Sequence, residues 1–170
     1  HRLDRNTTGI VLFAKNELSL NILLDKFKKH EITKKYLALV YGYPKQKYAK
    51  LESFLFKDTK KSQVYVSDIF KKGYQKIITF YSVIKEYKNN SSLLEVEIET
   101  GKTHQIRAHL AHIGYPIIGD GKYGINSVNK QFDAKYQQLQ AYKLIFEFTS
   151  DSNILNYLKG KTFEIKPNWN

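Results

Sequence analysis

The sequence contains no cysteine. This absence excludes disulfide bonds, thiolate catalysis and cysteine-ligated zinc sites. It is typical of proteins in a reducing compartment, so we expect a cytoplasmic protein. No apolar run approaches the roughly 18 residues that a membrane span needs, and no signal peptide is visible at the start. We therefore expect no association with a membrane.

Methionine is also absent, including at the first position, where the chain opens on His1. We therefore expect a fragment of a longer protein whose N-terminal part is missing. The 170 residues fit one domain of ordinary size, and a chain of this length buries well over half of the surface that it exposes when unfolded. No internal repeat or linker divides residues 1–170, so we expect a single domain that acts as a monomer.

Acidic residues are scarce relative to basic ones. The chain has 28 lysines and arginines against 16 aspartates and glutamates, which gives a net charge of +12. The resulting pI near 9.6 is typical of proteins that bind nucleic acid by neutralising phosphates and releasing counterions. A well-solvated surface can have the same composition, so the charge leaves both readings open. The hydrophobic content of 42% excludes a disordered chain.

Hydrophobic periodicity predicts an α+β domain with a mixed, largely antiparallel sheet flanked by helices. The short apolar run over residues 9–14 indicates a buried strand. Residues 17–30 show a helical pattern, because apolar residues recur at spacings of three and four on one face: Leu20, Leu23, Leu24 and Phe27. The last turns carry cations that suit the helix dipole: Lys26, Lys28, Lys29 and His30. Further strands are predicted at 36–43, 51–56, 63–66, 76–87, 92–100 and 139–148, and helices at 104–113 and 152–158.

Residues 76–87 and 92–100 are expected to form a hairpin around residues 88–91. In the second arm Leu94, Val96 and Ile98 alternate with glutamates, which is the pattern of a half-buried strand. The polar stretch over residues 126–138 shows no pattern that assigns it a structure.

The predicted helix over residues 104–113 carries a dense set of polar side chains. Thr103 is placed to cap it and Gly114 to end it. Core residues are expected at spacings of four and three: Ile106, Leu110 and Ile113. His104 and Arg107 are three residues apart and share another face, which could be an ordinary exposed polar face.

Three histidines lie at positions 104, 109 and 112, and they raise the question of a metal site. Ligands must lie on one face, and only His109 and His112 satisfy that condition by spacing. Without a nearby carboxylate to join them, we expect no metal site.

Asp4 lies in a loop that leads into the predicted strand over residues 9–14. A rigid strand would hold its carboxylate in place, and the flanking Arg2 and Arg5 would keep it ionised. An aspartate that merely forms a turn before a strand has the same local pattern. The local sequence therefore leaves a catalytic and a structural role open.

Taken together, these segments resemble the RluA-type (ribosomal large subunit) RNA pseudouridine synthases. The start of the chain is similar to the family pattern H-R-L-D-x-x-T-S/T-G, and residues 100–110 are similar to T-G-R-T-H-Q-I-R-x-H-L. Residues 35–42, together with the preceding Lys34, resemble K-x-Y-x-A-x-V-x-G, and residues 114–120 resemble G-x-P-I-x-G-D. Two residues depart from the pattern. Lys102 replaces an arginine and so lacks its planar fork, and Gln140 replaces a histidine.

The resemblance, which extends to about residue 148, implies a pseudouridine synthase-like catalytic domain with a central RNA-binding cleft. It implies that Asp4 is the catalytic carboxylate, that Arg107 pairs with it, and that Tyr36 packs on the target base. Asp4 could attack the ribose C1′, attack the uracil ring or abstract a sugar proton, and the sequence does not choose between these paths. The reaction needs no cofactor. In the family an S4-like RNA-binding domain often precedes this region.

The same resemblance implies an RNA partner, most simply ribosomal RNA, with the target uridine flipped out of its stack. Candidate RNA-binding residues surround the predicted site: Arg2, Arg5, Lys34, Lys35, Lys102, His104 and Gln105. Three alternatives remain: transfer RNA as the substrate, an RNA-binding module without catalysis, or a carboxylate-dependent hydrolase. A hydrolase needs a second catalytic carboxylate, for which Asp120 and Glu99 are candidates.

Overall fold

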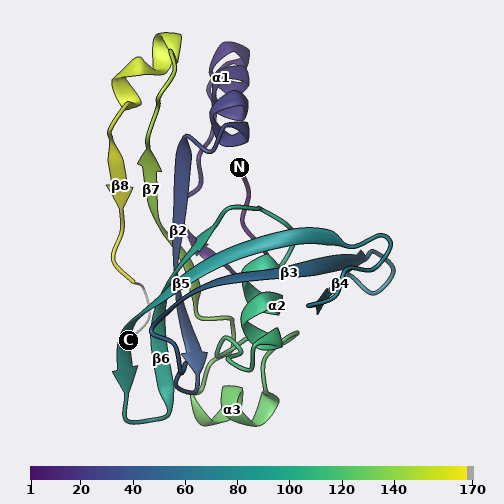
Figure 1. Cartoon of the computed structure of the whole chain (residues 1–170). Coiled ribbons are helices and arrows are strands. Elements are labelled where there is room, and N and C mark those ends of the chain that lie inside the picture. The colour runs from purple at the N-terminus through teal and green to yellow at the C-terminus, as the bar shows by residue number, and fades with distance from the viewer. Residues whose placement is uncertain (168–170) are drawn as a thin grey trace.

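The computed structural model describes residues 1–167 and contains one long, twisted sheet (Figure 1). The strands follow the spatial order β1-β7-β2-β6-β5-β3-β4, and β8 also pairs with β7. Only β1 and β7 pair in parallel among the described strands. The prediction of an α+β domain with a largely antiparallel sheet is therefore confirmed. The strand bounds are β1 (Thr8–Gly9), β2 (Ile32–Tyr41), β3 (Tyr48–Asp58), β4 (Gln63–Ser67), β5 (Gln75–Tyr87), β6 (Ser91–Ile98), β7 (Leu139–Phe146) and β8 (Thr162–Glu164).

The helices lie against different parts of this sheet. In Figure 1, α2 packs across the middle, α1 stands beside the upper part of β2, and β3 to β5 project as an arm. No helix within residues 1–167 is both long and apolar enough to cross a membrane. The bounds are α1 (Glu17–Lys28), α2 (Gln105–His112), α3 (Asn126–Gln131) and a 3₁₀ helix (Asn153–Leu158).

The main core lies between α2 and the central strands, and the sequence predicted much of it. Ile106 and Leu110 are buried as expected, and Ile113 packs at the edge of the same cluster. Leu94 and Val96 of β6 are fully buried, which confirms the alternating pattern. The predicted hairpin is β5 and β6, joined by a turn that pairs Tyr87 with Ser91.

The buried strand predicted over residues 9–14 is wrong. Only Thr8 and Gly9 pair with β7, and the ladder ends with a hydrogen bond from Ile10 N to Ala141 O. The next part of this β7 edge is occupied by β8, so the segment cannot continue as a strand. Phe13 is accordingly 81% exposed.

The predicted helix over residues 17–30 exists but ends at Lys28, and part of its predicted buried face is wrong. Leu23 is buried, whereas Leu20 and Leu24 are exposed. Lys26, which the sequence placed among the cations of the last turns, is fully buried. Its Nζ donates to Glu31 Oε2 at 2.7 Å and to the carbonyl oxygen of Ser150 at 2.8 Å. A buried ion pair between Lys26 and Glu31 thus fills space that apolar side chains usually fill in a core.

This buried pair makes the stability of the fold depend on pH. Hydrogen bonds from Lys26 and Thr149 outweigh burial and hold the pKa of Glu31 at about 2. An unfolded glutamate has a pKa of about 4.3. The stabilisation by Glu31 is therefore complete above about pH 4.3 and is lost as the pH falls towards 2.

We expect Glu31→Gln to lower the free energy of unfolding at pH 7, because the buried Lys26 loses its counter-ion. The gap in free energy between wild type and variant should narrow at about pH 3, because Glu31 is then mostly protonated in the unfolded chain but still mostly ionised in the folded one. Urea unfolding at both pH values measures this gap, with the exposed Glu99→Gln as control. A gap that stays constant or widens on acidification contradicts the assignment.

One other local prediction needs correction, and one unassigned segment gains a structure. Thr103 does not cap α2, because the N-cap residue is His104, which has a left-handed backbone (φ 54°) and makes no side-chain cap hydrogen bond. The unassigned stretch over residues 126–138 contains α3.

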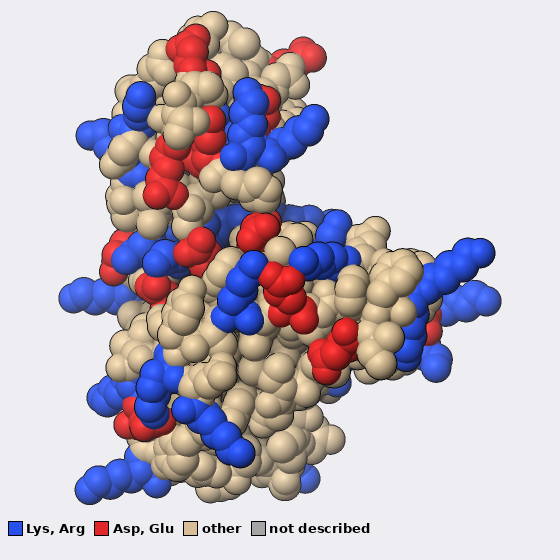
Figure 2. All heavy atoms as spheres, in the orientation of Figure 1, with Lys and Arg blue, Asp and Glu red and all other residues tan. Residues whose placement is uncertain are grey.

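Basic side chains are spread over the face seen in Figure 2 and are prominent at the end of the arm, with acidic side chains among them. Net charge alone therefore does not locate a binding site.

Candidate active site

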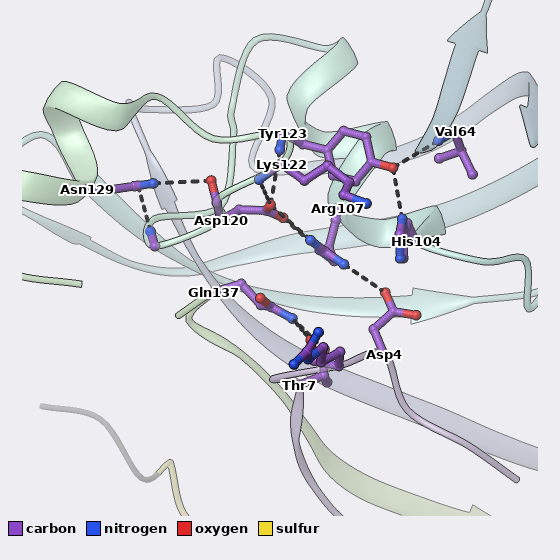
Figure 3. A network of polar contacts seen from close by, with 12 residues as sticks. Asp4, Thr7, Val64, His104, Arg107, Asp120, Lys122, Tyr123, Asn129 and Gln137 are labelled. Atoms are coloured by element: carbon purple, nitrogen blue, oxygen red, sulfur yellow. Dashed lines mark hydrogen bonds and ion pairs between the residues drawn. The ribbon is translucent and has the colours of Figure 1, made fainter. Parts of the chain in front are cut away.

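Asp4 lies in a tight turn at the start of the chain, just before β1. The carbonyl of Asp4 accepts a hydrogen bond from Thr7 N at 3.0 Å, so the residue does form a turn. Its side chain is 25% exposed, and Oδ2 lies 3.5 Å from Arg107 Nη1 (Figure 3). Asp4 thus has both local roles that the sequence left open: it shapes a turn, and it presents an accessible carboxylate beside a cation.

Asp4 and Tyr36 line the same cavity, which has a volume of about 320 Å³. Its walls come from the N-terminal turn, the end of α1, strand β2 and the start of α2. Apolar side chains such as Leu3 and Ile106 form much of the lining. A concave, mostly apolar pocket with a few converging polar groups is the usual form of a ligand site.

Tyr36 is held firmly in the middle of the sheet, because β2 pairs with β6 on one side and β7 on the other. The residue is 7% exposed. Burial, with a smaller effect of the nearby Asp4 charge, raises the pKa of Tyr36 to about 12. Its hydroxyl therefore keeps its proton at neutral pH and can act as a hydrogen-bond donor.

Arg107 is fixed mainly by Asp120, not by Asp4. Its Nε donates to Asp120 Oδ2 at 2.7 Å, and its Nη2 donates to Oδ1 at 3.0 Å. This bidentate geometry is the strongest form of arginine–carboxylate contact. The guanidinium also lies 5.3 Å from the ring centroid of Tyr123. Nη1 is left to face Asp4, as Figure 3 shows.

The two buried charges stabilise each other's ionised forms. Asp120 is fully buried, and burial alone would raise its pKa. The hydrogen bonds and charge of Arg107 outweigh that effect and lower the pKa of Asp120. Burial would likewise lower the pKa of Arg107, but its contacts with Asp120 raise it. Arg107 thus stays charged and places a cation beside Asp4.

The expectation that Arg107 pairs with Asp4 is therefore corrected in part. The contact exists, but it is the longer one, and Asp120 is the main partner. Asp120 also loses its candidacy as the second carboxylate of a hydrolase, because it is buried and engaged with Arg107. Glu99, the other candidate, is exposed at a neighbouring pocket and does not line the cavity with Asp4.

A second set of residues holds Asp120 in place, and the sequence did not reveal it. The backbone N–H groups of Lys122 and Tyr123 donate to Asp120 Oδ1. The Asn129 side chain donates to the carbonyl of Asp120 and accepts from Gly119 N. Gly119 has φ +80°, and a Cβ there would lie 2.0 Å from the carbonyl oxygen of Tyr136, so only glycine fits. The Gly-Asp pair of the G-x-P-I-x-G-D pattern was the available signal for Asp120.

Gln137 ties the N-terminal turn to the rest of the fold. Its Nε2 donates to the carbonyl of Arg5 at 2.6 Å and to Thr7 Oγ1 at 3.2 Å. This contact joins residues about 130 positions apart, and nothing in the sequence of residues 126–138 pointed to it. Gln137 therefore positions the turn that carries Asp4.

The side chain of His104 is partly engaged in a contact within the protein, with the hydroxyl of Tyr123. The Tyr123 hydroxyl accepts from Val64 N at 2.9 Å and lies 2.8 Å from His104 Nδ1. Burial lowers the pKa of His104 and outweighs the opposing effect of Asp4, so the neutral form of the ring is favoured. His104 lines a small pocket beside the arm and not the cavity that holds Asp4.

The predicted RNA-binding residues do not all reach the cavity. Four of them line it: Arg2, Lys34, Lys102 and Gln105. Arg5 is exposed on the adjoining turn. Lys35 does not line it. Side chains alternate along β2, so Lys35 points to the opposite face from Tyr36 and pairs with Glu95 at 2.7 Å.

Gln105 lines the cavity, but its polar atoms are turned to partners within the protein. It is 2% exposed, and its amide is saturated within the protein. Nε2 donates to Ile78 O and Thr79 Oγ1, and Oε1 accepts from Thr100 Oγ1 and Lys102 N. Gln105 thereby fixes the loop that leads into α2.

The remaining histidines of α2 serve the core and the surface. His109 is fully buried between Thr79 and Ser53, and burial lowers its pKa to about 4. His112 contacts Asp68. Across residues 1–167, no three acidic or histidine side chains gather in a way that could hold a metal ion.

Comparisons with known proteins agree on one family. The sequence profile of the family described as RNA pseudouridylate synthase matches residues 1–112. Ribosomal large subunit pseudouridine synthase C of Rickettsia felis is 38% identical over 141 residues, which cover 83% of this chain and 45% of that protein. Ribosomal large subunit pseudouridine synthase D of Buchnera aphidicola is 36% identical over 73% of this chain and 38% of its own length. The chain thus spans less than half the length of these relatives.

Two solved structures share the fold. Human RNA Pseudouridylate Synthase Domain Containing 4 superposes with a TM-score of 0.76 at 22% identity, covering 98% of this chain and 70% of its own. Human RNA Pseudouridylate Synthase Domain Containing 1 gives 0.75 at 24% identity, covering 89% of this chain and 64% of its own. At these identities the likeness concerns the fold alone.

Proposed function

The chain belongs to the RNA pseudouridylate synthase family, and from this premise we propose that it converts uridine in RNA to pseudouridine with Asp4 as the catalytic carboxylate. One observation carries the proposal. The Asp4 carboxylate lies beside Arg107 and lines the cavity that Tyr36 also lines. A base that enters this cavity meets an ionised carboxylate and an aromatic wall together.

The reaction rearranges bonds without losing a group. The bond between uracil N1 and ribose C1′ breaks, the base turns, and C5 joins C1′. N1 gains a proton, and the hydrogen on C5 leaves as a proton, so atoms and electrons balance. Asp4 can assist by attacking C1′, by attacking the ring or by removing a sugar proton. Each path uses Asp4 as a carboxylate, and the guanidinium of Arg107 lies 3.5 Å from it.

Tyr36 supplies two contributions in this proposal. Its ring forms a wall of the cavity, where stacking on a base contributes about 1–3 kcal/mol. Its hydroxyl remains protonated because its pKa is raised to about 12. It can therefore donate a hydrogen bond to the base, or relay a proton during the turn from N1 to C5.

A Tyr36→Phe substitution should leave RNA affinity nearly unchanged, because the ring is retained, and should slow product formation, because the donor is lost. Single-turnover release of tritium from uridine labelled at C5 measures the second effect, and a filter-binding titration measures the first. Tyr81→Phe, a buried tyrosine outside the cavity, is the matched control. Equal single-turnover rates for Tyr36→Phe and wild type remove the hydroxyl from the mechanism.

We further propose ribosomal RNA of the large subunit as the substrate, because the curated relatives bear that name. The target atoms are inaccessible in a stacked helix, so the uridine must flip out, which costs roughly a few kcal/mol. Loops and bulges reduce this cost because their bases are already unstacked. Arg2 and Lys102 line the cavity and are placed to contact the RNA backbone there.

Mapping pseudouridines in cells with and without the gene tests the choice of substrate. A site in large-subunit RNA that disappears with the gene supports the proposal. A site in transfer RNA shifts the assignment to that substrate. Unchanged maps of both RNAs leave a non-catalytic RNA-binding protein as the alternative.

A further inference from the structure

A second pocket lies directly beside the cavity that holds Asp4 and shares part of its wall. Its volume is about 300 Å³. Phe27, Lys34 and Lys102 line both spaces. The far side of the second pocket is formed by the end of α1 and the residues after it. We call this second space the basic pocket, after four of its lining residues: Lys28, His30, Lys34 and Lys102.

Lys34 is the central feature of the basic pocket, because it is a half-buried cation that the protein itself leaves uncompensated. Burial lowers the pKa of its ammonium group. Within residues 1–167 no carboxylate lies within ion-pair distance of Lys34, in contrast to its neighbour Lys35. The ammonium lies 5.0 Å from the ring centroid of Phe27. Removing a charge from water without a partner is costly, so the site favours an anion from outside.

The glycine opposite Lys34 keeps this ammonium accessible. A Cβ placed on Gly101 would lie 3.7 Å from Lys34 Nζ, so a longer side chain there would extend towards the charge. Gly101 lines both the cavity and the basic pocket. An anion can therefore approach Lys34 from the side that faces a bound substrate.

We propose that the basic pocket binds a phosphate of the RNA backbone next to the uridine that enters the cavity. This inference rests on the proposed function, because it takes the occupant of the neighbouring cavity to be a flipped nucleotide. The shared wall fits one strand that passes through both spaces, with its base in one and an adjoining phosphate in the other. Lysine binds phosphate as a point charge, so Lys102 suits this task without the planar fork of arginine.

The position of Lys34 on β2 also fixes where a bound phosphate would lie relative to a base in the cavity. Lys34 and Tyr36 are two residues apart on β2 and lie on the same face of the sheet. A phosphate at Lys34 would thus be held at a set distance from a base packed on Tyr36. Glu99 is the one acidic residue that lines the pocket, and it is exposed to solvent, where its repulsion is screened.

The test compares Lys34→Gln with Lys35→Gln in the binding of a large-subunit RNA fragment across a fourfold range of salt. Both variants lose one positive charge from adjacent residues of the same strand. Loss of one phosphate contact lowers the slope of log K against log salt by about 1. The fourfold rise in salt should then weaken Lys34→Gln about threefold less than wild type. Lys35→Gln should keep the wild-type slope.

The melting temperatures of the same variants give a second measurement. Lys34→Gln should match or exceed the wild type, because an uncompensated cation is removed. Lys35→Gln should melt lower, because Glu95 loses its partner. Lys34→Arg keeps the charge and should restore the wild-type salt slope.

A wild-type slope for Lys34→Gln, or an equal loss of slope for Lys35→Gln, overturns the inference. If the wild-type protein releases tritium from uridine and Lys34→Gln binds RNA with an unchanged salt slope, the phosphate site alone is refuted. A wild-type protein that neither binds nor modifies RNA refutes the proposed function, and the phosphate site with it.

Discussion

Replacing Asp4 with asparagine should stop pseudouridine formation while RNA binding persists. The substitution keeps the shape of the side chain and removes its charge, so the residue can act neither as a nucleophile nor as a base. Loss of a positioned base alone typically lowers a rate by about 10²–10⁴, and loss of a nucleophile lowers it further. Tritium release from uridine labelled at C5 measures the rate, and filter binding at fixed salt measures the affinity.

The matched control for this experiment is Asp133→Asn, on an exposed aspartate outside the cavity. Its backbone has φ 47°, a conformation that asparagine tolerates as well as aspartate does. This control should retain full activity. If Asp4→Asn and Asp133→Asn are equally active, Asp4 is not the catalytic carboxylate. If Asp4→Asn loses binding together with activity, its role is in contacting RNA.

Replacing Arg107 with alanine should lower the free energy of unfolding by about 3–5 kcal/mol, because a buried charge pair is broken and Asp120 is left uncompensated. Asp120 is fully buried and receives two hydrogen bonds from the guanidinium. Activity should fall more than the folded fraction does, because Asp4 loses the cation that lies 3.5 Å away. Urea unfolding and tritium release under folding conditions separate the two effects.

Two further variants separate the contribution of the Arg107–Asp120 ion pair to stability from its contribution to the site around Asp4. Arg107→Lys keeps the charge but loses the bidentate fork, so part of the stability should remain. Asp120→Asn in the Arg107→Ala background should cost less than the sum of the single changes, because the uncompensated charge is removed. An Arg107→Ala protein with wild-type stability and activity would refute the buried pair and the support that it gives to Asp4.

The sequence predicted elements whose pattern depends on local burial alone. The alternation of leucine, valine and isoleucine with glutamate identified β6, and the spacing of Ile106 and Leu110 identified the core face of α2. The strand expected over residues 9–14 failed because β8 occupies the β7 edge that it would have needed. The face of α1 was misjudged because the buried Lys26 meets a glutamate five residues on.

The candidate site was predictable where a motif marked it and not where long-range contacts build it. Asp4 lies beside Arg107 and lines one cavity with Tyr36, although the main partner of Arg107 is Asp120. The bidentate role of Asp120 depends on a contact with another element, which no local pattern encodes. By contrast, strand alternation along β2 was sufficient to place Lys35 on the opposite face from Tyr36. Lys35 was nevertheless predicted to bind RNA together with Lys34, because both residues are positively charged.

The most direct test of the account is tritium release by the wild-type protein from a large-subunit ribosomal RNA transcript labelled at C5 of uridine. Formation of the new bond between C5 and C1′ expels the hydrogen on C5 into water. Tritium release should saturate at a whole number of sites per transcript. No release from an RNA that the protein demonstrably binds would contradict this prediction and would leave an RNA-binding domain without catalysis.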